Sequence, residues 1–274
     1  MAKDVVAVQG AAIHVEQYGE GGPALFLHGV PDSAELWSPV IGVASREYRC
    51  IAPDLPGFRR SQLPRDFTFS LDGYAVWVND LVNALGIDEP LTLVGHDWGG
   101  IFGLAWACKY PERASRVVVM DTIFSHLYRW HPWARVWRTP VLGELSMLLM
   151  NRPLFMSEMR RGSVLLDDAW LARLWSAMQE NYRTRFVTLQ LYRSLNPPRL
   201  LPWQPLLRAL AASTPLTVLH GAHDPYIPGW TTRLFHTDDV RVLEDVGHWV
   251  PAEAPAAVLA ALGVAAADNH GTQA

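Results

Sequence analysis

The residues of this chain best suited to chemistry occur together in the sequence Gly-His-Asp-Trp-Gly-Gly at residues 95–100. This segment follows an apolar run at residues 91–94 and precedes a run with helical spacing at residues 101–110. Glycines at these positions are typical of a tight turn between a strand and a helix, which lifts a central nucleophile clear of the backbone. The central residue is Asp97. A carboxylate attacks a saturated carbon and leaves an ester on the enzyme, so we expect Asp97 to be a nucleophile rather than a helix cap.

An ester formed on Asp97 is released by water, which needs a base to activate it. His248 follows the strand-like segment at residues 240–243 and is the candidate base. Asp224 lies between nucleophile and base in the chain, in the order nucleophile, acid, histidine that is typical of such a turn. We expect Asp224 to orient the imidazole and stabilise its cation. Asp121, at the end of another apolar run, is the alternative acid.

The carbonyl of the ester gains negative charge during hydrolysis, so the site needs backbone donors beside Asp97. The N–H of Trp98 directly follows the nucleophile. A second N–H is expected from Val30, which lies in His-Gly-Val-Pro at residues 28–31, just after an apolar run. The sequence therefore predicts that the N–H groups of Trp98 and Val30 form an oxyanion hole beside Asp97, at the substrate-binding site.

The elements that must position these residues alternate along the chain. Short apolar runs at residues 24–27, 50–52, 91–94 and 117–120 predict buried parallel strands, and helical spacing occurs at residues 71–85 and 101–110. This alternation predicts an α/β fold with a mostly parallel sheet flanked by helices. After Asp121 the chain has helical character and is rich in Arg, Trp, Leu and Met until about Ser213. We therefore predict a core domain at residues 1–121 and 214–274 and an inserted helical cap at residues 122–213.

Charge is divided unevenly between these two parts. The cap range holds 12 arginines and five acidic residues, a net charge of +7, which leaves 11 basic and 22 acidic residues elsewhere. Opposite charges on the two parts favour electrostatic docking of the cap on the core over an anion-attracting pocket mouth.

Composition excludes several classes of function. The chain has 274 residues, of which 50% are hydrophobic. Its net charge is −4, so it lacks the positive electrostatic field that attracts nucleic acid. No apolar run reaches the ~20 residues that span a bilayer, and we expect no membrane partner. Cys50 and Cys108 each lie in an apolar stretch of sequence, and we see no leader pattern. We therefore expect a cytoplasmic protein. No metal spacing or nucleotide motif occurs, so we expect no metal, no cofactor, a small-molecule substrate, and a monomer or homodimer.

The chain resembles the α/β-hydrolase fold over about residues 4–262. Within that fold it resembles the aspartate-nucleophile branch, which contains epoxide hydrolases and haloalkane dehalogenases. The resemblance rests on residues 95–100, the loop at residues 28–31 with Trp37 downstream, Asp224, and the pair Gly247-His248. It implies covalent catalysis through Asp97, but it is shared by both groups of enzymes.

Two positions help to separate the reactions that the resemblance implies. Haloalkane dehalogenases typically carry Asn or Glu as a halide ligand where this chain has Val30, which has no side-chain donor. In those enzymes the indole of the residue matching Trp98 also binds halide. Epoxide hydrolases use phenols of the cap to protonate the oxirane oxygen, and Leu-Tyr-Arg at residues 191–193 resembles a segment that carries one. Tyr192 therefore favours an epoxide hydrolase.

The second oxirane-binding group of that family has no clear match, although Tyr128, His126 and His131 lie in the corresponding half of the cap. The sequence predicts an epoxide hydrolase that forms an ester on Asp97 and releases a vicinal diol. Haloalkane dehalogenation by the same nucleophile is the alternative. A non-catalytic ligand-binding protein on a hydrolase scaffold is the alternative from another class.

Overall fold

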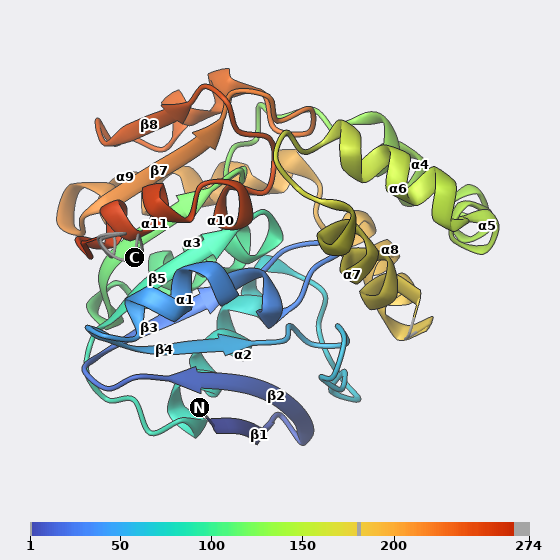
Figure 1. Ribbon diagram of the computed structural model, residues 1–274. Coiled ribbons are helices and arrows are strands. Elements are labelled where there is room, and N and C mark those ends of the chain that lie inside the picture. The colour runs from blue at the N-terminus through green and yellow to red at the C-terminus, as the bar shows by residue number, and fades with distance from the viewer. Residues whose placement is uncertain (1, 180–181, 266–274) are drawn as a thin grey trace, which may run out of the picture.

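A single eight-stranded sheet runs through the computed structural model, which describes residues 2–179 and 182–265 (Figure 1). The strand order is β1-β2-β4-β3-β5-β6-β7-β8. The first two strands pair antiparallel, β2 pairs antiparallel with β4, and all later pairs are parallel. The strands are β1 (Ala2–Val8), β2 (Ala11–Tyr18), β3 (Gly22–Leu27), β4 (Tyr48–Pro53), β5 (Leu91–His96), β6 (Ala114–Met120), β7 (Leu216–Gly221) and β8 (Val240–Leu243).

Helices cover both faces of this sheet. Alternate residues of β3 show the division, since Leu25 and Leu27 belong to a buried cluster with residues of α2 and α3, whereas Ala24 and Phe26 belong to a cluster with residues of α1 and α11. The helices of the core are α1 (Ser38–Ala44), α2 (Leu71–Ala84), α3 (Trp98–Lys109), α10 (Val250–Glu253) and α11 (Pro255–Leu262), with short 3₁₀ segments η1 (Ala34–Trp37), η2 (Pro111–Arg113) and η4 (Gly229–Leu234). The predicted α/β architecture is therefore confirmed.

The register of the parallel strands brings three loops to one edge of the sheet. His96 pairs with Met120, and Met120 pairs with Leu219. The residues that follow β5, β6 and β7 consequently lie side by side, as expected where parallel strands end. Helix α3 begins at Trp98, earlier than the predicted start near residue 101, because the turn at Asp97 leads straight into the helix.

The segment predicted as a cap is helical. It contains α4 (Pro132–Arg138), α5 (Leu142–Leu149), α6 (Arg152–Arg161), α7 (Asp168–Gln179), α8 (Tyr182–Ser194), η3 (Pro197–Trp203) and α9 (Gln204–Ser213). Helices α4 to α8 gather at one side of the molecule in Figure 1, whereas α9 packs against α3 of the core. The division at residues 122–213 stays a proposal, and residues 266–274 of the proposed core lie outside the described part of the chain.

No helix among residues 2–179 and 182–265 combines the length and the apolar character that crossing a membrane requires.

Candidate active site

Asp97 occupies a strained turn between β5 and α3. Its φ of 50° and ψ of −121° are rarely adopted by a residue with a side chain, and its carboxylate makes no capping hydrogen bond to α3. A Cβ on Gly95 would lie 2.7 Å from Cα of Gly100, and one on Gly99 would lie 2.1 Å from the carbonyl oxygen of Leu27. These close approaches explain why the turn requires glycine on both sides of Asp97.

Two backbone N–H groups contact the Asp97 carboxylate. The N–H of Val30 donates to Oδ2 of Asp97 at 2.9 Å, and the N–H of Trp98 lies beside the carboxylate and favours its ionised form. Gly29 is required beside them, since a Cβ there would lie 2.4 Å from Oδ2 of Asp97. The arrangement can hold one oxygen of Asp97 as it becomes an ester carbonyl and then an oxyanion.

His248 is held by Asp224. Nδ1 of His248 donates to Oδ2 of Asp224 at 2.8 Å, and both side chains are buried. The other oxygen of Asp224 accepts hydrogen bonds from the N–H groups of Tyr226 at 2.7 Å and Ile227 at 3.0 Å. A carboxylate fixed in this way sets the tautomer of the imidazole and leaves Nε2 of His248 free to act as a base.

Asp121, the alternative acid, is engaged elsewhere. Its Oδ1 accepts from the N–H of Gly221 at 2.9 Å and lies 3.1 Å from Nδ1 of His220. Burial raises the pKa of Asp121 to about 7 despite the opposing hydrogen bond from His220. The structure thus pairs His248 with Asp224 and His220 with Asp121.

The pKa values of Asp97 and His248 are shifted by their buried surroundings. Burial raises the pKa of Asp97 to about 6, although the positive charge of His248 and the N–H groups of Val30 and Trp98 oppose the shift. Burial disfavours the charged form of His248, but the carboxylates of Asp224, Asp97 and Asp121 outweigh it and raise the pKa of His248 to about 9. At neutral pH the pair is therefore an ionised carboxylate beside an imidazolium.

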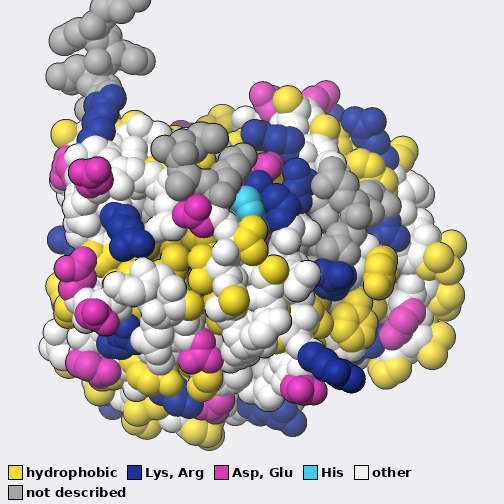
Figure 2. All heavy atoms as spheres, turned by 90° about the horizontal axis from the view of Figure 1, so that it is seen from below, with side chains coloured by type: hydrophobic (Ala, Val, Ile, Leu, Met, Phe, Trp, Pro, Cys, Tyr) yellow, Lys and Arg dark blue, Asp and Glu magenta, His cyan; other side chains and the backbone are white. Residues whose placement is uncertain are grey.

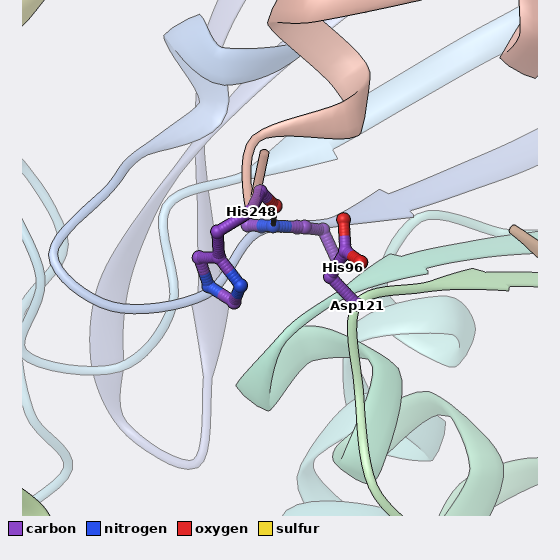
Figure 3. A group of neighbouring side chains, drawn as sticks. All are labelled: His96, Asp121 and His248. Carbon is purple, nitrogen blue, oxygen red and sulfur yellow. Dashed lines mark hydrogen bonds between the residues drawn. The ribbon is translucent and has the colours of Figure 1, made fainter. Parts of the chain in front are cut away.

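His96 connects the nucleophile strand to the loop of the base. Figure 3 shows His96, Asp121 and His248 as neighbouring side chains, and ligand-type atoms of the three lie within 4.8 Å of one another. A second such group is formed by Asp121, His220 and Asp224. Within these groups Asp121 pairs with His220, and Asp224 pairs with His248. Nε2 of His96 lies 2.8 Å from the carbonyl oxygen of His248. The cluster therefore forms a buried hydrogen-bonded network beneath the base.

An apolar cavity opens above Asp97 and His248, and cap helices form much of its wall. Aromatic side chains dominate its lining, with few polar groups among them, as is typical of a site for an apolar small molecule. The lining residues that carry rings are Trp98, Tyr128, Trp130, His131, Trp133, Trp137, Phe155, Tyr192, Tyr226, His248 and Trp249.

Tyr192 lines the same cavity as Asp97. Its ring meets Trp98 edge to face with centroids 5.0 Å apart, and the Trp98 side chain hydrogen-bonds to the Tyr192 hydroxyl. Burial, followed by the charge of Asp97, raises the pKa of Tyr192 well above its ordinary value. The phenol is therefore protonated at neutral pH and available as a donor.

The other cap residues expected near the substrate differ in position. Tyr128 lines the cavity with its ring, but its hydroxyl donates to the carbonyl of Tyr226 at 2.9 Å. His131 also lines the cavity, whereas His126 does not belong to the described lining. Sequence reasoning missed Tyr226, whose ring lies 5.0 Å from that of His248, although its place two residues after Asp224 was a signal.

Comparisons with known proteins agree with the α/β fold of this chain. Residues 22–255 match the family model described as the alpha/beta hydrolase fold. The chain belongs to this family. It is an enzyme of the α/β-hydrolase superfamily and is similar in sequence to haloalkane dehalogenases.

Three relatives show the range of this family. The chain is 28% identical to haloalkane dehalogenase 2 of Mycobacterium bovis over 209 residues, which is 75% of this chain and 70% of that protein. It is 32% identical to the cis-3-alkyl-4-alkyloxetan-2-one decarboxylase of Shewanella oneidensis over 120 residues, but this match spans only 43% of this chain and 38% of that protein. The solved epoxide hydrolase CorEH shares the fold with a TM-score of 0.76 at 21% identity, covering 95% of this chain and 96% of the other.

Proposed function

We propose that this protein is an epoxide hydrolase that converts a small to medium-sized apolar epoxide to a vicinal diol. The observation that carries the proposal is the presence of the buried Tyr192 phenol and the Asp97 carboxylate in one aromatic cavity. An epoxide needs both groups, since opening its ring requires a nucleophile at carbon and a proton for the oxygen.

In the first step Oδ1 of Asp97 attacks an epoxide carbon, because Oδ2 is held by the N–H of Val30. The bond from that carbon to the ring oxygen breaks, and the hydroxyl of Tyr192 transfers its proton to this oxygen. The product is an ester between Asp97 and a 2-hydroxyalkyl group, together with a tyrosinate.

Before the second step the imidazolium of His248 passes a proton to the tyrosinate, which restores Tyr192 and leaves the imidazole neutral. Nε2 of His248 then takes a proton from water, and the oxygen of that water attacks the carbonyl carbon of the Asp97 ester. The N–H groups of Val30 and Trp98 stabilise the negative oxygen of the tetrahedral intermediate. The ester C–O bond breaks, the new carboxyl group of Asp97 gives its proton to the departing alkoxide to form the diol, and the Asp97 carboxylate beside the His248 imidazolium is restored. Asp224 holds the imidazole throughout.

Haloalkane dehalogenation is the second candidate, and the similarity to the Mycobacterium bovis dehalogenase over most of the chain supports it. Two contacts argue against it as the main activity. Val30 offers no side-chain donor for a leaving halide, and the Trp98 side chain is already bonded to Tyr192. A halide would have to displace the phenol from that donor.

Incubation of the purified enzyme with matched panels of epoxides and haloalkanes tests the proposal. We expect diol formation from epoxides and little halide release. Halide release without diol formation would reverse the order of the two candidates, and carbon dioxide release from a 3,4-dialkyloxetan-2-one would point to the reaction named for the Shewanella oneidensis relative. Tight ligand binding without turnover, unchanged in Asp97→Asn, would support a ligand-binding protein instead.

The proposed location is the cytoplasm. The two cysteines, Cys50 and Cys108, are buried free thiols, which fits a reducing compartment.

A further inference from the structure

Helix α5 turns an apolar face outward at the end of the cap. Leu142, Leu145, Leu148 and Leu149 fall within about a third of the helix circumference. They are 45–74% exposed, and the preceding Val141 is 67% exposed. We call these five residues the cap-tip surface. Figure 2 shows hydrophobic side chains gathered at the edge of the molecule where Figure 1 shows the cap helices, at the right of both views.

The other side of α5 packs into the protein. Met147 is buried, and Ser146 faces the active-site cavity. One thin helix therefore separates the cavity from the cap-tip surface. A group of leucines this exposed in a globular protein commonly marks a surface that contacts another protein or a membrane.

The cavity wall continues toward this surface. Met150, the residue after α5, and Leu154, in the first turn of α6, both line the cavity, and Leu154 is nevertheless 47% exposed. Apolar side chains thus extend from the catalytic cavity to the outside of the cap beside the cap-tip surface.

The charge around the cap-tip surface is positive or neutralised. Glu144 is the acidic residue of α5, and its two carboxylate oxygens accept hydrogen bonds from Arg193 at 2.7 and 2.8 Å. Arg152, the first residue of α6, is exposed close by in the chain. The residues 122–213 carry a net charge of +7, while the rest of the chain is acidic.

We propose that the cap-tip surface docks onto an anionic phospholipid bilayer. A helix that combines exposed leucines with a neighbouring exposed arginine, Arg152, can insert its apolar face among acyl chains while the cation meets a lipid phosphate. A second copy of this chain fits less well, because a symmetric contact through α5 would bring two caps of net positive charge together. Such docking needs no membrane-spanning helix. Composition led us to expect no membrane partner, because the exposure of the α5 leucines depends on the fold and is not visible in composition.

Docking at a bilayer would also favour one class of substrate, an inference that rests on the proposed function. Lipophilic epoxides partition into bilayers, and a cap docked through α5 would place Leu154 and Met150 near that source. The preferred substrates would then be epoxides with long apolar chains, presented in vesicles rather than in free solution.

Flotation with vesicles of phosphatidylcholine, with and without phosphatidylglycerol, tests the docking. We expect the full-length protein to float with the anionic vesicles, to bind pure phosphatidylcholine weakly, and to dissociate in high salt. The variant Leu148→Gln/Leu149→Gln should lose at least about tenfold in partitioning, because two inserted apolar side chains are removed. Leu201→Gln, at a cap leucine of η3 that is 56% exposed, is the control and should bind like the unaltered protein.

Equal binding of the double variant and the unaltered protein, or no binding to anionic vesicles, would overturn the proposal. Thermal melting of each variant shows whether it is folded, and the single variant Leu148→Gln provides a milder substitution. A concentration-dependent dimer that the double variant abolishes, without vesicle binding, would identify a second copy as the occupant. Vesicle binding should persist in Asp97→Asn, so failure of the proposed catalysis leaves the docking result intact.

Discussion

Nε2 of His96 donates a hydrogen bond of 2.8 Å to the backbone carbonyl of His248. His96 directly precedes the proposed nucleophile Asp97, so the end of strand β5 also fixes the loop that carries the proposed base (Figure 3). Burial keeps the pKa of His96 far below its ordinary value, and the neutral ring has one N–H to donate. His96 is therefore a positioning residue for His248.

Replacing His96 with alanine should slow hydrolysis of the ester more than its formation, because only the second step needs His248 as a base. We expect the adduct on Asp97 to accumulate, as measured by intact mass during turnover. His96→Gln retains a side-chain N–H donor and should restore part of the hydrolysis rate. Equal slowing of both steps in a folded His96→Ala protein would show that the contact is merely structural.

Asp97 and His248 act in different proposed steps, so replacing them should change the amount of covalent adduct in opposite directions. Asp97→Ala should abolish turnover and adduct formation together, since no carboxylate remains to attack. His248→Gln should still form the ester but release it at least about 10²-fold more slowly. Mass spectrometry of each variant with substrate checks both, and turnover by His248→Gln without an adduct would count against covalent catalysis.

The turn at Asp97 could be predicted because glycine spacing reports local backbone geometry. The close approaches of Gly95 to Gly100 and of Gly99 to Leu27 depend on residues that adjoin one another in the chain or in neighbouring strands. The strand runs were predictable for the same reason, since buried parallel strands are continuous apolar segments.

The partners of the acids could not be predicted, because they depend on loop conformations between distant segments. Asp121 and Asp224 follow neighbouring strands at the same sheet edge. The left-handed φ of 42° at Asp121 accompanies its contacts with the N–H of Gly221 and the ring of His220, whereas Asp224 meets His248. The hydroxyl of Tyr128 likewise finds its acceptor 98 residues away, at Tyr226.

The two acids should respond differently to neutralisation. Asp224→Asn removes the acceptor of the Nδ1–H of His248, so the imidazole can adopt the wrong tautomer and lose its stabilised cation. We expect ester hydrolysis to fall by about 10²-fold or more. Asp121→Asn should reduce it by less than about tenfold, because its partner is His220. The reverse order of effects on adduct decay would assign the role to Asp121.

Tyr192→Phe should lower the rate of epoxide opening by about 10²- to 10⁴-fold, because the ring oxygen then leaves without a proton donor. Single-turnover adduct formation measures this step directly. Tyr226→Phe is the matched control, since the Tyr226 ring lines the cavity but its hydroxyl lies 3.2 Å from Oε1 of Glu158. Equal effects of the two substitutions would remove Tyr192 from its proposed role. Any halide release should be unchanged or faster in Tyr192→Phe, because the Trp98 side chain becomes free.

The two chemical steps should depend on pH in different ways. Ester formation requires ionised Asp97, so its rate should fall as pH decreases through about 6, the raised pKa of that carboxyl group. Ester hydrolysis requires neutral His248, so its rate should rise with pH. In the free enzyme the pKa of His248 is about 9; burial lowers it, but the carboxylates of Asp224, Asp97 and Asp121 raise it by more.

Formation of the ester changes that balance, because alkylation removes the negative charge of Asp97. One of the charges that stabilise the imidazolium is then lost, so the pKa of His248 must be lower in the covalent intermediate than in the free enzyme. The first step therefore prepares the base for the second. Adduct decay followed against pH after rapid mixing should give a midpoint below about 9, while NMR titration of His248 in the free enzyme should give the higher value. A decay midpoint at or above the free-enzyme value would contradict this coupling between nucleophile and base.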